Sequence, residues 1–198
     1  MVGEEDTPRR GRPRSPQVRN AVVRAAVDLA LTGGPGAASV DAIAKRAGVS
    51  RTTIYKWWPS SAAIVLEGLL ESVHDSIVRP PGSSTPEALR HHVRELNRIL
   101  CRPPTGPLLR NVIAASASDP AITRAVIDQW ITPRREAVAE ILRHAVSAGE
   151  IGADTDIEVA VDALVSPPYY RLTLGMTPLD DAAVGRLTET VWRGLVDD

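Results

Sequence analysis

The chain has 198 residues, 43% hydrophobic and 24% charged, and this balance is typical of a globular protein that buries a core. The chain has a single cysteine, Cys101, which excludes an intrachain disulfide. No apolar run reaches the about 20 residues that span a bilayer, and the polar first residues do not resemble a secretory signal. We therefore expect a cytoplasmic protein without a membrane partner. The net charge of −1 conceals a division: residues 1–60 carry ten Lys and Arg against five acids, and the rest carries 13 against 19, so only the N-terminal part suits a polyanion.

Residues 1–15 lack apolar periodicity and combine charges with proline and glycine, so we expect a disordered basic arm. Ser15 and Pro16 then suit the N-cap and first position of a helix. Apolar residues recur at helical spacing from Val18 to Ala30, and the Gly-Gly-Pro-Gly run at 33–36 ends this helix.

A second helix is predicted from Ser39, which serves as its cap, to Ala47, and Gly48 ends it. Ser50 then caps a short third helix over 51–58. Two short helices joined by a tight turn that contains glycine are typical of a helix-turn-helix unit, which together with the first helix occupies residues 16–60.

The remaining residues, 61–198, are also helical in pattern, and no segment shows the period-two alternation of a strand. Pro133 lies inside one of these patterns, so we expect a kink or break near residues 129–133. The fold class is therefore all-α with about nine helices, the later six over 62–78, 85–101, 105–118, 120–148, 155–175 and 180–196.

In the third helix, Ile54 and Trp58 are spaced to face inward, and polar residues are left on the other side. An arginine in the first turn can form two hydrogen bonds with guanine, and hydroxyl groups can form hydrogen bonds with bases or phosphates. A helix N-terminus attracts phosphate. The candidate DNA contacts are Ser39, Ser50, Arg51, Thr52, Thr53, Tyr55, Lys56 and Trp57. Taken singly, each has an ordinary alternative: a solvated charge, a helix cap, or a half-buried aromatic.

The segment SVDAIAKRAGVSRTTIYKWWPSSAAIVLEGL resembles the DNA-binding region of the TetR family of one-component transcriptional regulators, and the match covers residues 16–69. Ala47-Gly48-Val49-Ser50 and Thr53-Ile54-Tyr55 carry much of the likeness. Two positions depart from the family pattern: Thr52 replaces a small residue, and Ser61 replaces a lysine that commonly binds phosphate. A looser likeness to one C-terminal branch lies in Thr132-Pro133-Arg134-Arg135, Ala148-Gly149-Glu150-Ile151 and Pro168-Tyr169-Tyr170-Arg171-Leu172.

The resemblance implies a body, residues 61–198, that encloses a pocket for a small-molecule effector and forms a homodimer through its last two long helices. It also implies a palindromic double-stranded DNA operator, and repression that the effector relieves. Trp130, Tyr169 and Tyr170 are the candidate ligand contacts, although aromatics at helical spacing are usually core residues.

The arm RRGRPR, residues 9–14, resembles an AT-hook core, and Arg12 and Arg14 would then enter an A·T-rich minor groove. The alternative is a tail that only aids solubility or binds DNA without specificity.

Two other classes of protein remain as alternatives. An enzyme would need catalytic residues, but the sequence has no Gly-rich phosphate loop, nucleophile motif or metal-ligand cluster. The spacing of His91, His92 and Cys101 matches no metal site, so we expect no cofactor. A purely structural DNA binder would be small and basic throughout, unlike the acidic body of this chain. Stabilisation by a lipophilic ligand would distinguish a sensor from such a binder.

Overall fold

The computed structural model describes residues 15–33, 36–71 and 80–196, which form helices joined by loops, with no strand among them. The N-terminal part contains α1 (Pro16–Gly33), α2 (Val40–Ala47), α3 (Arg51–Tyr55) and α4 (Ser61–Glu71). The rest contains α5 (Thr85–Cys101), α6 (Thr105–Ser116), α7 (Pro120–Val126), the π-helical turn η1 (Ile127–Ile131), α8 (Thr132–Ser147), α9 (Ile157–Leu174) and α10 (Asp181–Val196). Because α7, η1 and α8 follow one another without a loop, the described residues form nine continuous helical rods, and the all-α prediction is confirmed.

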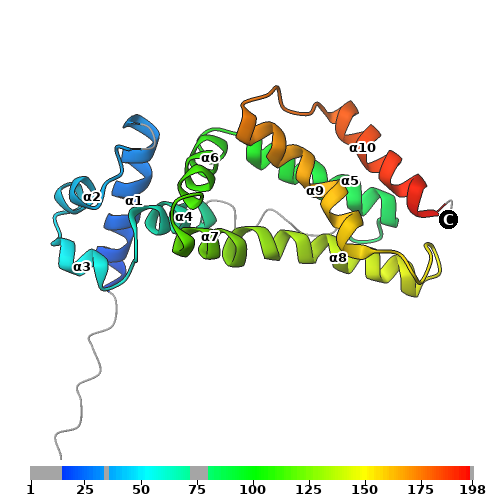
Figure 1. Ribbon diagram of the computed structural model, residues 1–198, viewed down its shortest axis with the longest axis horizontal. Helices are drawn as coiled ribbons and strands as arrows, with labels where there is room; N and C mark the ends of the chain where they lie inside the picture. Colours follow the sequence, from blue (N-terminus) through cyan, green and yellow to red (C-terminus); the bar gives the residue numbers. More distant parts are fainter. Residues whose placement is uncertain (1–14, 34–35, 72–79, 197–198) are drawn as a thin grey trace, which may run out of the picture.

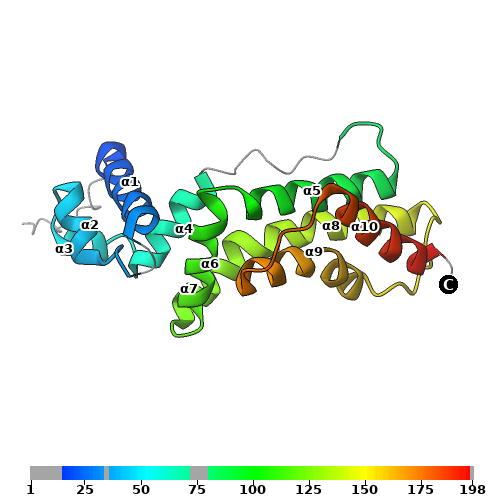
Figure 2. The ribbon, with the colours of Figure 1, turned by 90° about the horizontal axis from the view of Figure 1, so that it is seen from above.

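The molecule is elongated, with a small group of helices, α1 to α3, at one end and a larger body, α5 to α10, at the other (Figure 1). The view from above shows the same arrangement (Figure 2). Helix α4 lies between the two parts, where it contacts α1 on one side and α6 and α7 on the other. The expected helix over 62–78 is described as far as Glu71, and its remainder lies outside the described residues.

Short-range capping fixes the ends of the small helices. The hydroxyl of Ser39 accepts a 3.2 Å hydrogen bond from the amide of Ala42, which satisfies one of the free donors at the start of α2. Gly48 follows α2 with φ of 67°, a left-handed conformation that glycine adopts without strain. Ser50 caps α3 in the same way as Ser39 caps α2, by accepting from the amide of Thr53.

Helix α3 is shorter than the range 51–58 that the sequence indicated, because its α-helical part ends at Tyr55. A hydrogen-bonded turn continues to Trp58, whose amide donates to the carbonyl of Ile54. Pro59 then prevents further helix, since proline has no amide hydrogen and disfavours helical geometry in the residue before it.

The packing of α1 against α4 is close because Gly68 faces α1. A methyl group placed on Gly68 would lie 2.5 Å from Cγ2 of Val27 and 2.9 Å from Cγ1 of Val23, both shorter than normal contacts. Two ion pairs join the same helices, from Arg19 to Glu67 (2.5 Å) and to Glu71 (2.6 Å). The position of the small N-terminal unit is therefore tied to α4.

The irregularity predicted near residues 129–133 takes the form of the π-helical turn η1. The amide of Thr132 donates to the carbonyl of Ile127, five residues earlier, and Pro133 has no amide to complete the ordinary pattern. Such a turn inserts one extra residue and rotates the side chains that follow it. No helix in the described part of the chain is long and apolar enough to cross a membrane.

Candidate functional site

Helix α3 buries one face and leaves the other in solvent. Ile54 is fully buried and Trp58 is 3% exposed, so the apolar side anchors the helix in the core, where α3 contacts α2. Tyr55 is 59% exposed, and Arg51, Thr52 and Lys56 are exposed as well. The polar side chains of α3 therefore meet solvent and remain open to a partner at the end of the molecule (Figure 1).

Arg51 forms an ion pair with Asp41 of α2, with 3.0 Å between Nη1 and Oδ1. Both side chains are more than half exposed. An exposed pair of this kind contributes about 0–1 kcal/mol, so a stronger anionic or hydrogen-bonding partner can displace Asp41 from Arg51.

Three of the predicted DNA contacts have structural roles at helix ends. The hydroxyls of Ser50 and Thr53 share a 2.9 Å hydrogen bond, and each serine, Ser39 and Ser50, caps its helix. Both serines are nevertheless exposed, while Thr53 is half-buried. Capping leaves the serine hydroxyls at the surface beside the amides of the two helix N-termini.

Trp57 is half-buried and packs against the core, with its ring edge-on to Trp58 at a centroid separation of 5.8 Å. Because consecutive side chains point in different directions, Trp58 lies in the core and Trp57 lies at its boundary with solvent. Arg12 and Arg14 of the basic arm lie outside the described residues.

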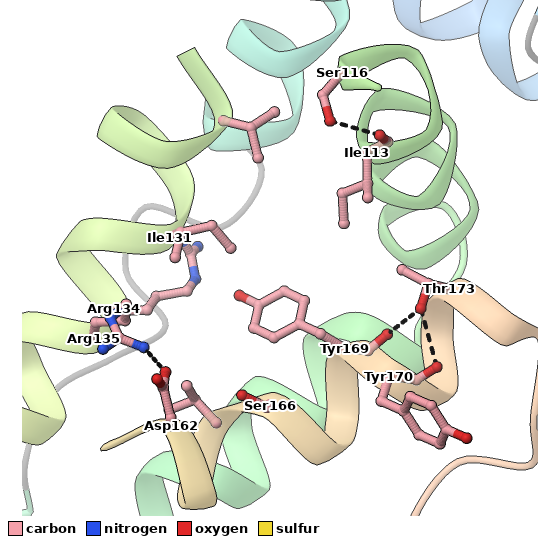
Figure 3. A pocket seen from close by; sticks show the side chains of 12 residues that line it. Ile113, Ser116, Ile131, Arg134, Arg135, Asp162, Ser166, Tyr169, Tyr170 and Thr173 are labelled. Atoms are coloured by element: carbon pink, nitrogen blue, oxygen red, sulfur yellow. Dashed lines mark hydrogen bonds and ion pairs between the residues drawn. The ribbon is translucent and has the colours of Figure 1, made fainter. Parts of the chain in front are cut away.

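A cavity of about 460 Å³ opens in the body between α6, the α7–α8 rod and α9 (Figure 3). This volume lies within the range of small-molecule sites. Its wall consists of Ile113, Ser116, Val126, Ile131, Arg134, Arg135, Asp162, Val165, Ser166, Tyr169, Tyr170 and Thr173.

Three side chains from the α7–α8 rod and α9 contact one another beside the cavity. The guanidinium of Arg134 lies 3.6 Å from the ring centre of Trp130, and its Nη1 donates a 2.7 Å bond to the carbonyl of Trp130. The indole nitrogen of Trp130 donates a 2.9 Å bond to the hydroxyl of Tyr169. Burial raises the pKa of the Tyr169 hydroxyl to about 12 and lowers the pKa of Arg134 below its ordinary value.

The neighbouring arginine has a different environment. Arg135 pairs with Glu158 at 2.6 Å and also with Asp162, both of which belong to α9. These bonds to two carboxylates raise the pKa of Arg135. Arg135 therefore holds α8 to α9 at the rim of the cavity, and its charge is balanced.

The predicted ligand contacts are placed unequally around the cavity. Tyr169 and Tyr170 both line it, and Tyr170 is 58% exposed. Trp130 is fully buried and lies behind Arg134, so it supports the wall instead of forming it.

Arg134 was not singled out from the sequence. Helical spacing offers the signal, because Arg134 shares a face of α8 with Val138, Leu142 and Ala145, all of which are buried. An arginine on a buried stripe is exceptional and marks a position for closer attention.

Within the residues that the structure describes, no group of three or more His, Cys, Asp or Glu side chains is arranged to hold a metal ion. His92 is buried against α8, and burial, with the nearby Arg134 charge as a smaller cause, lowers its pKa to about 4. Cys101 lies at the exposed end of α5.

Comparison with known proteins identifies the family to which this chain belongs. Residues 22–67 match the model of bacterial regulatory proteins of the tetR family, and residues 79–191 match the tetracyclin repressor-like C-terminal domain. The chain therefore belongs to the TetR family of helix-turn-helix transcriptional regulators.

Particular relatives cover almost the whole chain. It is 32% identical over 187 residues to the HTH-type transcriptional regulator YdeS of Bacillus subtilis, covering 94% of both chains. It is 30% identical over 179 residues to the DNA-binding transcriptional repressor TetR of Mycobacteroides abscessus, covering 86% of this chain and 90% of that one.

Two solved structures resemble the fold. The TetR family transcription regulator SCO0332 superposes with a TM-score of 0.72 and 35% identity, covering 90% of this chain and 98% of that one. The flavonoid-responsive regulator FrrA superposes with a TM-score of 0.67 and 26% identity, covering 91% and 96%.

Proposed function

We propose that this protein is a homodimeric, cytoplasmic repressor that binds a palindromic operator and is released from it by a small-molecule effector. The exposed polar face of α3 carries this proposal, because the helix is held by Ile54 and Trp58 while its remaining side chains meet solvent. An α-helix with this exposure fits the major groove of DNA.

Each side chain of that face has a distinct role in the proposed complex. Arg51 leaves Asp41 and contacts the acceptors of a guanine, and Thr52 contacts a base edge or a thymine methyl group. Tyr55 and Lys56 bind phosphates on the groove walls, and the amides beside Ser39 and Ser50 bind others, helped by Thr53 and Trp57 at the margin. Arg12 and Arg14 extend the contact into the adjacent minor groove.

Dimerisation is supported by an apolar stripe on α9. Val159, Tyr170 and Leu174 are exposed and share one face of this helix with the exposed Ala163. Large apolar side chains that line up on a surface mark a contact with another protein. A two-fold dimer through α9 and the adjacent α10 would present two copies of α3 to two half-sites.

The arrangement of helices supports a route from effector to operator. The cavity is walled by α6 and the α7–α8 rod, α6 and α7 contact α4, and α4 contacts α1 of the DNA-binding unit. An effector that binds one arrangement of α6 and α7 better than another shifts α4 and alters the spacing of the two α3 helices. The relatives named as a transcriptional repressor and as a flavonoid-responsive regulator support repression and response to a ligand.

The test is selection of bound fragments from the host's genomic DNA, followed by footprinting of the enriched fragments. We expect an inverted repeat whose half-site centres lie about one helical turn apart or a multiple of it, bound by a dimer as measured by light scattering. Enrichment without a shared repeat, or binding by a monomer, would contradict the proposal.

A further inference from the structure

The cavity in the body contains a buried cation that has no carboxylate partner in the part of the chain that the structure describes. Arg134 is 6% exposed, and no acidic side chain among the described residues lies within ion-pair distance of it. Its Nη1 donates to the carbonyl of Trp130, whereas its Nε is buried and has no acceptor among the described residues. The edge formed by Nε and Nη2, the edge that binds carboxylates in a bidentate manner, is thus unused by the described chain.

Carboxylates are nearby, but they serve another residue. Asp162 and Glu158 of α9 both pair with Arg135, the residue next to Arg134. The described residues therefore balance the charge of Arg135 at the rim and leave the deeper charge of Arg134 without a carboxylate. Burying an unpaired charge is unfavourable unless a partner supplies the missing interactions.

A second donor faces the same space. The hydroxyl of Tyr169 accepts from the indole of Trp130, so its own hydrogen is available for another acceptor. Figure 3 shows the Tyr169 hydroxyl and the Arg134 side chain extending toward each other from opposite walls of the cavity. With its pKa raised to about 12, the hydroxyl keeps its proton at neutral pH and acts as a donor.

Two other hydroxyls of the wall are already bonded within the chain. The hydroxyl of Ser116 donates to the carbonyl of Ile113, and that of Thr173 donates to its own helix. His92, which lies near Arg134, is neutral at pH 7 because burial lowers its pKa to about 4. The remaining wall is mainly apolar, with Val126 and Val165 among its members.

We propose that the effector is an amphipathic organic acid whose anionic oxygens bind between the guanidinium of Arg134 and the hydroxyl of Tyr169, with its apolar body against the aliphatic wall. This inference deepens the proposed function and rests on it, because it names the chemical class of the molecule that releases the operator. The anion completes the bonds that Arg134 lacks, and the hydrophobic part fills the cavity.

The experiment uses the full-length protein and thermal-shift measurement with matched pairs of ligands. The probes are decanoate and naphthalene carboxylate, each paired with its primary amide, which keeps the shape and removes the charge. We expect at least one acid to raise the melting temperature in a dose-dependent way and its amide to have at least roughly tenfold weaker affinity. Equal stabilisation by acid and amide, or no stabilisation by either acid, would overturn the proposal.

Variants locate the anion within the cavity. Arg134→Gln and Tyr169→Phe should each weaken binding of the stabilising acid, while Arg143→Gln, a matched change of an exposed arginine on the same helix as Arg134, should leave it unaltered. If Arg134→Gln does not fold, Tyr169→Phe and the acid–amide comparison still decide the question. Unchanged acid affinity in Tyr169→Phe or in folded Arg134→Gln would overturn the site.

Operator binding is measured separately, so that the two proposals can fail separately. If the protein binds the acid but selects no inverted repeat, the anion site stands and the proposal that the protein is a repressor is contradicted. Operator binding that persists when the acid saturates the protein would show that the site does not control DNA, and would overturn the acid as effector.

Discussion

The indole nitrogen of Trp58 donates a 2.6 Å hydrogen bond to Oε2 of Glu67, which joins the turn after α3 to helix α4. Glu67 also pairs with Arg19 of α1, so a single carboxylate of α4 connects α1 and the turn after α3 in the DNA-binding unit. The anchoring of α3 thus includes a polar bond between partly buried groups as well as the burial of Ile54 and Trp58.

Trp58→Phe should therefore destabilise the protein by about 1–3 kcal/mol, because it removes the donor, leaves Glu67 with one bond fewer and opens a small space. Urea unfolding measures the loss. Glu67→Gln is the matched variant, since the amide oxygen still accepts from Trp58 while the charge facing Arg19 is removed. A loss in Trp58→Phe of less than about 0.5 kcal/mol would show that the hydrogen bond does not anchor the turn.

Arg51→Ala should relax specificity at one base pair of each half-site by about 1–3 kcal/mol, because the bidentate contact with guanine is lost. Asp41→Asn is the complementary variant: it frees Arg51 from its ion pair and should tighten operator binding. Gel-shift titration against a library of single-base operator variants measures both effects. A uniform loss across all sequences in Arg51→Ala would instead assign Arg51 to a phosphate.

Deletion of residues 1–14 should weaken operator binding and reduce the slope of its salt dependence, because the arm carries arginines that displace counterions from DNA. Fluorescence anisotropy at several salt concentrations provides both quantities. Affinity and slope equal to those of the full chain would remove Arg12 and Arg14 from the DNA contact.

Gly68→Ala should destabilise the protein by about 1–3 kcal/mol, since the added methyl collides with Val23 and Val27 and forces α1 away from α4. It should also reduce operator affinity, because the same helix pair positions the DNA-binding unit. Gly36→Ala, at an open position where a methyl meets no atom within 4 Å, is the control. Equal stability of the two variants would mean that the α1–α4 contact adapts without cost.

The buried His92 should make stability depend on pH. Its pKa of about 4 in the folded protein lies below the ordinary value of 6.5, so between these values the unfolded chain binds more protons. Stability therefore rises with pH through this window and falls on acidification, by about 2 kcal/mol between about pH 7 and pH 5. Urea unfolding of the wild type and of His92→Gln isolates this contribution, which the variant should lack. Parallel curves for the two proteins would contradict it.

The sequence alone determined the local structure of the DNA-binding unit. Ser39 and Ser50 act as caps, Gly48 takes the left-handed turn, and Ile54 and Trp58 are buried, all as predicted. These features depend on interactions within a few residues, which the order of side chains specifies directly. The end of α3 was the exception, because the hydrogen-bonded turn before Pro59 is not an α-helical continuation.

Only the tertiary structure decided the chemistry of the cavity. Trp130 and Tyr169 are 39 positions apart, and the hydrogen bond between them exists because α9 packs on the α7–α8 rod. Likewise, two adjacent arginines are equivalent in the sequence, yet α9 supplies carboxylates to Arg135 and none to Arg134. Which arginine has a carboxylate partner depends on the rotation of α8 after its π-helical turn and on the helix that packs against each of its faces. The spacing of residues along the sequence does not specify this packing.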